Sequence, residues 1–160
     1  MKNKKLILTI MTLLWIAVIF SFSLQPGEVS GDISGSLLQK VLEWFAPRVF
    51  EQLETMPQEQ LEFWHTVLRK CAHITEFAVL GVLSSLTLLQ TKVSCRDLSA
   101  MAFCLMIAAM DETLQLFVDG RAGRVVDVMI DGAGALVGIG VVFVLAVAGV
   151  YLSCEYNKNL

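Results

Sequence analysis

Residues 125–152 read VVDVMIDGAGALVGIGVVFVLAVAGVYL, a run of 28 residues whose only charged side chains are Asp127 and Asp131. A helix that crosses the hydrocarbon core of a bilayer needs about 20 mainly apolar residues, so this run is long enough to span a membrane. In lipid, the polar groups of the main chain must be paired within the segment, which favours a helix. We therefore predict a membrane-spanning helix here.

Three more apolar runs precede it, at residues 6–22, 71–89 and 98–118, with lengths of 17, 19 and 21 residues. Together the four runs predict an all-α protein, a four-transmembrane-helix bundle that forms a single domain over residues 1–160. The first run also suits a secretory signal peptide, although Ser21-Phe22-Ser23 lacks the Ala-x-Ala cleavage pattern. An uncleaved helix is therefore the favoured interpretation.

Residues 23–70 form a long connection that is predicted to be a partly helical outer loop. Leu37–Phe45 carries an apolar stripe at helical spacing. That stripe suits either an amphipathic helix at the membrane interface or a cap packed on the bundle. Pro47 should end this helix near Ala46, and Pro57 suits the first position of the helix that leads into the second span.

The composition excludes several classes of protein. Hydrophobic residues make up 56% of the chain and charged residues 17%, against about 45–50% and about 25% in soluble domains, so an ordinary cytosolic enzyme is not expected. The net charge of −3 and the lack of a basic stripe exclude nucleic acid as an expected partner. The four cysteines show no CxxC spacing, so we expect buried apolar thiols rather than disulfides.

The orientation in the membrane depends on where the basic residues lie. With four spans, both chain ends lie on one side of the membrane, and the 12 lysines and arginines divide evenly between the two sides. The first helix usually dominates, and Lys2, Lys4 and Lys5 precede it. We therefore predict a multi-pass protein of the cell membrane with both termini in the cytoplasm.

Ionisable side chains lie inside three of the apolar runs: Glu76, Asp111, Glu112, Asp127 and Asp131. Each costs about 2.5–3.5 kcal/mol at the centre of a membrane, so these groups must be paired or hydrated. At a rise of about 1.5 Å per residue, Glu76, Asp111 and Asp131 lie about 8, 10 and 9 Å from the same membrane face. The carboxylates are therefore predicted to share one level near the presumed outer face.

Helical spacing also places the polar residues on common faces, since residues three, four or seven apart lie on one side of a helix. The aligned sets are Arg69–His73–Glu76, Asp111–Gln115, Glu112–Gln115 and Asp127–Asp131. Gly134 and Gly138 continue the last set as a small-xxx-small contact face. With Arg69, Lys70, Arg121 and Arg124 nearby, we expect a polar pit with acidic walls and a basic rim.

Residues 69–77 read RKCAHITEF and residues 111–121 read DETLQLFVDGR, followed by Asp127, Asp131, Gly134 and Gly138. In this order, and with Gln25-Pro26-Gly27 within residues 23–34, the motifs resemble the signatures of the VanZ-like membrane proteins and cover most of the chain. One departure is a proline that the family commonly has near the position of Asp119, where this chain reads Val118-Asp119-Gly120. The resemblance implies a small integral membrane protein, and the founding member is associated with low-level resistance to teicoplanin.

The candidate catalytic residues are Glu76, Asp111, Glu112 and Asp127, since paired carboxylates suit general acid–base chemistry. The candidate substrate-binding residues are Arg69, Lys70, His73, Gln115, Arg121, Arg124 and Asp131. Neighbouring helical residues point about 100° apart, so either Asp111 or Glu112 should face the pit while the other pairs with Arg121 or Arg124. A hydrogen-bonded pair of His73 with Glu76, or a purely structural network of arginines and carboxylates, is the alternative.

No cofactor is assigned, and no metal ligand is predicted, because His65 and His73 are the only imidazoles. A carboxylate site for magnesium or manganese stays open on ligand type alone.

Three function classes fit these features. The first is a site that binds or processes an anionic envelope lipid or a phosphate-bearing cell-wall precursor, because arginine holds two phosphate oxygens at once. The second is a non-catalytic structural or regulatory membrane partner. The third is a proton-coupled transporter element, for which buried carboxylates are typical. The pattern favours the first, and whether the protein is an enzyme is left open.

Overall fold

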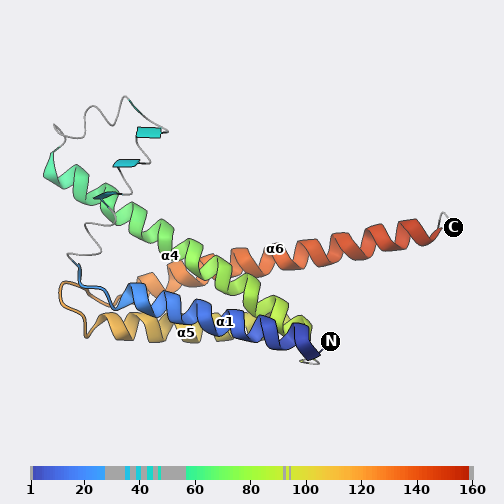
Figure 1. The fold of residues 1–160 in the computed structure, drawn as a ribbon. Helices are drawn as coiled ribbons and strands as arrows, with labels where there is room; N and C mark the ends of the chain where they lie inside the picture. The colour runs from blue at the N-terminus through green and yellow to red at the C-terminus, as the bar shows by residue number, and fades with distance from the viewer. Residues whose placement is uncertain are drawn as a thin grey trace.

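The computed structural model describes residues 2–27, 57–91, 93 and 95–158, and positions 35, 36, 39, 40, 43, 44 and 47. Four helices and no strands run through the described ranges (Figure 1): α1 (Lys2–Ser23), α4 (Gln58–Leu89), α5 (Arg96–Gln115) and α6 (Val125–Lys158). The all-α bundle of four helices that the sequence predicts is thereby confirmed. Of the interfacial helix predicted at Leu37–Phe45, positions 39, 40, 43 and 44 are described and are helical, whereas the residues of its apolar stripe lie outside the described residues.

The helix bounds differ from the apolar runs at several ends. α4 begins directly after Pro57 and continues without a break through the predicted second span, as expected. α5 ends at Gln115 because the amides of Leu116, Phe117 and Val118 bond to carbonyls three residues back, which closes a turn. α6 runs six residues beyond the predicted end at residue 152.

The helices present lipid-compatible surfaces. Among the described residues, three helical segments are long and apolar enough to cross a membrane: Asn3–Ser23, Gln58–Leu89 and Val125–Gly149. α5, which covers most of the run 98–118, is not among them by that measure. Large apolar side chains stay exposed along the bundle, with Leu13 at 60% and Leu145 at 66%. Because a soluble monomer rarely exposes so much apolar surface, the bundle suits a membrane.

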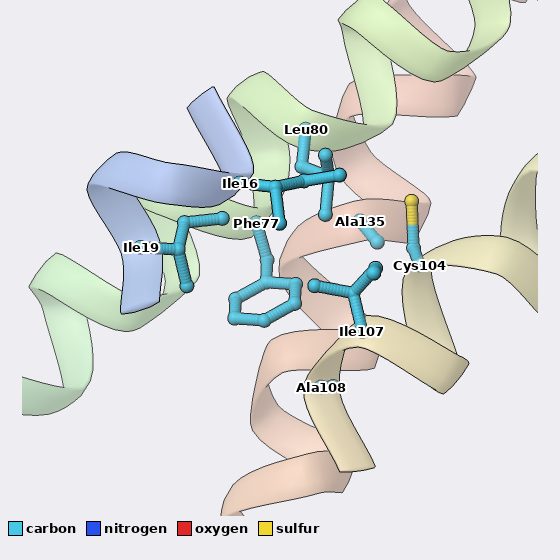
Figure 2. Packing of buried hydrophobic residues seen from close by; sticks show 8 residues of the cluster. All are labelled: Ile16, Ile19, Phe77, Leu80, Cys104, Ile107, Ala108 and Ala135. Atoms are coloured by element: carbon cyan, nitrogen blue, oxygen red, sulfur yellow. The ribbon is translucent and has the colours of Figure 1, made fainter. Parts of the chain in front are cut away.

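An apolar cluster joins all four helices (Figure 2). Its members are Ile16 and Ile19 of α1, Phe77 and Leu80 of α4, Cys104, Ile107 and Ala108 of α5, and Ala135 of α6. Removal of α1 as a signal peptide would uncover one side of this cluster, so its packing favours the uncleaved helix. Of the cysteines, Cys104 is buried as expected, but Cys71 and Cys95 are exposed free thiols, so the expectation of burial is wrong for those two.

The glycine stripe of α6 allows α4 to approach very closely. A Cβ added at Gly134 would collide with the carbonyl group of Ile74, and one added at Gly138 would collide with that of Ala78. The predicted small-residue contact face is therefore confirmed. Both helices run from left to right in Figure 1 and cross each other, and this contact sets the first turns of α6 beside the middle of α4.

Candidate functional site

A cavity of about 330 Å³ lies at the end of the bundle where α5 ends and α6 begins. This volume is within the range of about 300–1,000 Å³ that is usual for small-molecule sites. All seven predicted substrate-binding residues line it: Arg69, Lys70, His73, Gln115, Arg121, Arg124 and Asp131. Helical spacing therefore predicted correctly that these seven residues lie together. Their role in binding stays a prediction.

The four candidate catalytic residues occupy different positions. Asp127 lines the cavity, whereas Asp111 and Glu112 are buried in α5. Glu76 is partly buried, three residues beyond His73 on α4, and is not part of the cavity lining. The four carboxylates thus lie in one region but do not all face one space.

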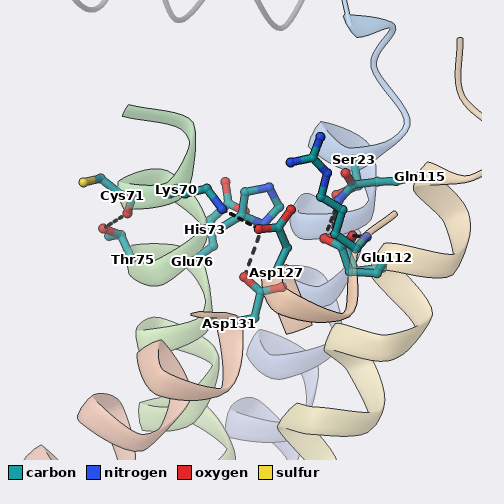
Figure 3. A network of polar contacts seen from close by, with 12 residues as sticks. Ser23, Lys70, Cys71, His73, Thr75, Glu76, Glu112, Gln115, Asp127 and Asp131 are labelled. Carbon is teal, nitrogen blue, oxygen red and sulfur yellow. Dashed lines mark hydrogen bonds and ion pairs between the residues drawn. The ribbon is translucent and has the colours of Figure 1, made fainter. Parts of the chain in front are cut away.

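His73, Asp111, Glu112 and Asp131 form a compact group that we call the buried cluster. Each offers one nitrogen or oxygen atom, and these four atoms all lie within 4.8 Å of one another. Asp111 and Asp131 are 0% exposed and Glu112 is 5% exposed. Figure 3 labels three of them, His73 of α4, Glu112 of α5 and Asp131 of α6, whose side chains lie in the space between these helices.

The two carboxylates of α5 are held by several donors. The hydroxyl of Ser23 donates to Asp111 Oδ2 at 2.8 Å, and Gln115 Nε2 donates to the same oxygen at 3.0 Å. Gln115 Nε2 also contacts Glu112 Oε1 at 3.2 Å. The main-chain amide of Arg124 donates to Glu112 Oε2 at 2.8 Å. Gln115 can reach both carboxylates because it lies four residues after Asp111 and three residues after Glu112 on one helix.

The two carboxylates of α6 meet α4. Lys70 Nζ lies 2.6 Å from Asp127 Oδ1 in a half-buried ion pair. His73 Nδ1 lies 3.4 Å from Asp131 Oδ1 as an ion pair, and Oδ2 of Asp131 has no hydrogen-bond partner. The predicted alternative that His73 bonds with Glu76 is therefore wrong, because the imidazole faces α6 instead.

The arginines of the rim do not balance the carboxylates through ion pairs. Arg121 Nη2 donates to the carbonyl of Phe22 at 3.1 Å, and Arg124 reaches Glu112 through its main chain alone. Within the part of the chain that the structure describes, no guanidinium at the cavity forms an ion pair with a carboxylate. The expected pairing of Asp111 or Glu112 with the side chain of Arg121 or Arg124 is therefore not found among the described residues; Glu112 accepts a hydrogen bond from the main-chain amide of Arg124 instead.

Arg121 has an unusual environment for an arginine. Its Nε is buried and has no hydrogen-bond partner. Burial lowers the pKa of Arg121, and the nearby positive charge of Arg69 lowers it further. Two guanidinium groups that repel each other at a cavity wall are a favourable arrangement for an anion.

A turn between α5 and α6 places these basic residues. Gly120 adopts a positive φ of 74°, which glycine tolerates without steric cost. The amide of Gly27 donates to the carbonyl of Asp119 at 3.0 Å, and a Cβ at Gly27 would collide with the carbonyl of Gly120. The turn therefore packs against Gly27, in the segment that follows α1.

Two polar side chains of the site, those of Ser23 and Thr66, were absent from the sequence-based prediction. Ser23 supports Asp111, and its only signal was its position at the start of the early-loop motif. Thr66 lines the cavity and lies three and seven residues before Arg69 and His73, so the same helical spacing would have identified it.

Comparison with known proteins agrees with the motifs. A family model described as VanZ/LLP1 matches residues 8–146, a range that contains every candidate site residue. No curated protein and no solved structure matches the chain. Since the family model covers most of the sequence and the helices carry an apolar surface, this membrane protein belongs to the VanZ/LLP1 family.

Proposed function

We propose that this membrane protein binds the phosphate of an anionic envelope lipid, or of a lipid-linked cell-wall precursor, in its basic cavity. The observation that carries the proposal is Arg121, whose buried Nε has no hydrogen-bond partner and which lines the same cavity as Arg69. A phosphate would accept charge-assisted hydrogen bonds from both groups and relieve their repulsion. Arginine suits this role because its planar fork binds two oxygens at once.

A lipid is favoured over a free phosphate by the surroundings of the cavity. The helices that carry it expose large apolar side chains, such as Val125 at 80% and Met129 at 70%, on the first turns of α6. A lipid would keep its acyl chains in the bilayer beside these side chains while its headgroup entered the cavity. We further propose that the cavity opens on the outer face, in line with the expected cytoplasmic position of both termini.

The apolar cluster argues against a transport path. Phe77 follows Glu76 directly, and Ala108 and Ala135 lie within one turn of Asp111 and Asp131. The bundle is therefore closed by packed apolar side chains immediately beyond the carboxylates. A site open at one end is the better account of this arrangement than a proton-coupled pathway.

The direct test is lipid binding by the purified protein, measured by native mass spectrometry with anionic and zwitterionic lipids. We expect Arg121→Ala to weaken binding of the anionic lipid about 10- to 150-fold, which corresponds to a lost charged hydrogen bond of about 1.5–3 kcal/mol. Arg96→Ala is the matched control, because Arg96 pairs with Asp97 at the other end of α5. Equal binding by the wild type and Arg121→Ala would contradict the proposal.

A second test concerns the carboxylates and the cell. Glu76→Gln, Asp111→Asn and Asp127→Asn should abolish any lipid-processing activity while the protein still accumulates in the membrane. Expression in a susceptible Gram-positive host should raise tolerance to lipid-tailed teicoplanin more than to vancomycin, because only the former is anchored at the membrane surface. Equal shifts for both drugs, or full activity in all three variants, would count against the site.

A further inference from the structure

We propose that the buried cluster of His73, Asp111, Glu112 and Asp131 binds one divalent metal ion of the class that accepts imidazole and carboxylate ligands together, such as Mn²⁺ or Zn²⁺. The sequence alone assigned no metal, although it left a carboxylate site for magnesium or manganese open; the structure adds an imidazole to the carboxylates. It concerns the groups beside the basic cavity and does not depend on a lipid being bound there.

The spacing of the four atoms suits a single ion. Nitrogen and oxygen ligands lie about 2.0–2.2 Å from such ions, so two ligands on opposite sides are about 4.0–4.4 Å apart. The four atoms of the buried cluster all lie within 4.8 Å of one another. Small side-chain rotations would close the remaining few tenths of an ångström.

The atoms that lack partners point to a cation independently of the spacing. Oδ2 of Asp131 and Oδ1 of Asp111 are buried and have no hydrogen-bond partner, and Oδ1 of Asp131 has only its 3.4 Å contact with Nδ1 of His73. Asp131 is completely buried, and its carboxylate faces the group. Buried polar atoms are almost always satisfied, and a cation would satisfy all of these acceptors together.

The charge balance favours the same conclusion. The buried cluster holds three carboxylates, and among the described residues His73 is the only basic side chain that contacts any of them as an ion pair. Lys70 is bound to Asp127, and Arg121 donates to a main-chain carbonyl. Uncompensated charges are very costly to bury, and a divalent ion would neutralise most of this excess.

The carboxylate ligands are also oriented as metal ligands usually are. Ser23 and Gln115 fix Asp111 through Oδ2 and leave Oδ1 free, while the amide of Arg124 fixes Glu112. Such supporting hydrogen bonds commonly orient the groups that hold a metal. His73 and Asp131 also line the cavity, which gives an ion a route of entry.

The test uses purified full-length protein in detergent after treatment with a chelator. Binding of Mn²⁺ is followed by the loss of the free-ion electron paramagnetic resonance signal, and bound Zn²⁺ by elemental analysis after dialysis. We expect about one ion per chain, with much weaker binding of Mg²⁺ because an imidazole ligand suits Mn²⁺ and Zn²⁺ better. Ser23→Ala should weaken binding roughly 10- to 100-fold, and Asp131→Asn should weaken it more.

Asp97→Asn is the matched control, because Asp97 lies on α5 and pairs with Arg96 outside the buried cluster; it should bind metal like the wild type. Arg121→Ala should weaken binding of the anionic lipid but leave metal binding unchanged, so the two measurements separate a failure of this inference from a failure of the proposed function. Wild-type protein that takes up neither ion, or Asp131→Asn that binds as tightly as wild type, would overturn the inference. Where Asp131→Asn does not accumulate, the metal content of the wild type and of His73→Gln decides.

Discussion

Replacing Gly138 by alanine tests whether the close approach of α6 to α4 holds the site together. A Cβ at Gly138 would lie 2.9 Å from the carbonyl carbon of Ala78, 3.0 Å from the amide nitrogen of Val82, and nearer still to the carbonyl oxygen of Ala78. These neighbours are main-chain atoms of a helix, so they cannot rotate away as a side chain would. The two helices must therefore separate.

The size of the effect follows from that separation. A gap of about 0.5–1 Å removes a quarter to a half of the dispersion energy of each contact, and an extra carbon in a well-packed core costs about 1–3 kcal/mol. We expect Gly138→Ala to lower the free energy of unfolding by that amount. Separation would also lengthen the 2.6 Å contact of Lys70 with Asp127 and the 3.4 Å contact of His73 with Asp131.

Gly140→Ala is the control on the same helix, because a Cβ there meets no atom within 4 Å. It should leave the free energy of unfolding unchanged or raise it by up to about 1 kcal/mol, since alanine is the better helix former. Titration with sodium dodecyl sulfate in mixed micelles, followed by tryptophan fluorescence, measures both variants. Gly138→Ala protein as stable as Gly140→Ala protein would refute the packing argument.

Three further predictions concern orientation, packing and the cavity. In a variant whose only cysteine is Cys95, which is exposed, a membrane-impermeant thiol reagent should label the protein only after lysis; labelling of intact cells would place that loop outside. Trp15→Phe should lower the free energy of unfolding by about 0.5–1.5 kcal/mol, because the indole donates to a main-chain carbonyl of α4 at 2.9 Å; an unchanged detergent titration would contradict it. Lys70→Ala should weaken anionic-lipid binding less than Arg121→Ala in native mass spectrometry, because Asp127 already pairs with Lys70; the opposite order would show that the lysine is the main anion contact.

Much of the site was accessible to prediction because helices have a fixed period. Knowing that Arg69 and His73 share a face requires only their spacing, and both line the cavity. The same period correctly aligned Gly134 and Gly138 with α4. The prediction of a hydrogen bond between His73 and Glu76 was wrong. Two residues on one face of a helix can each contact a different neighbouring helix, and helical spacing does not determine which one.

The sequence by itself determined the four apolar runs, the similar depth of the carboxylates within them, and the family. These features depend on length, hydropathy and motif order along one chain. Only the tertiary structure decided the partners of the polar groups: the hydroxyl of Ser23 on Asp111, the main-chain amide of Arg124 on Glu112, and the carbonyl of Phe22 for Arg121. The physical reason is that hydrogen bonds and metal ligation require distances correct to a few tenths of an ångström. Such distances between helices depend on their rotation and approach, which packing at glycine contacts sets and which no local period encodes.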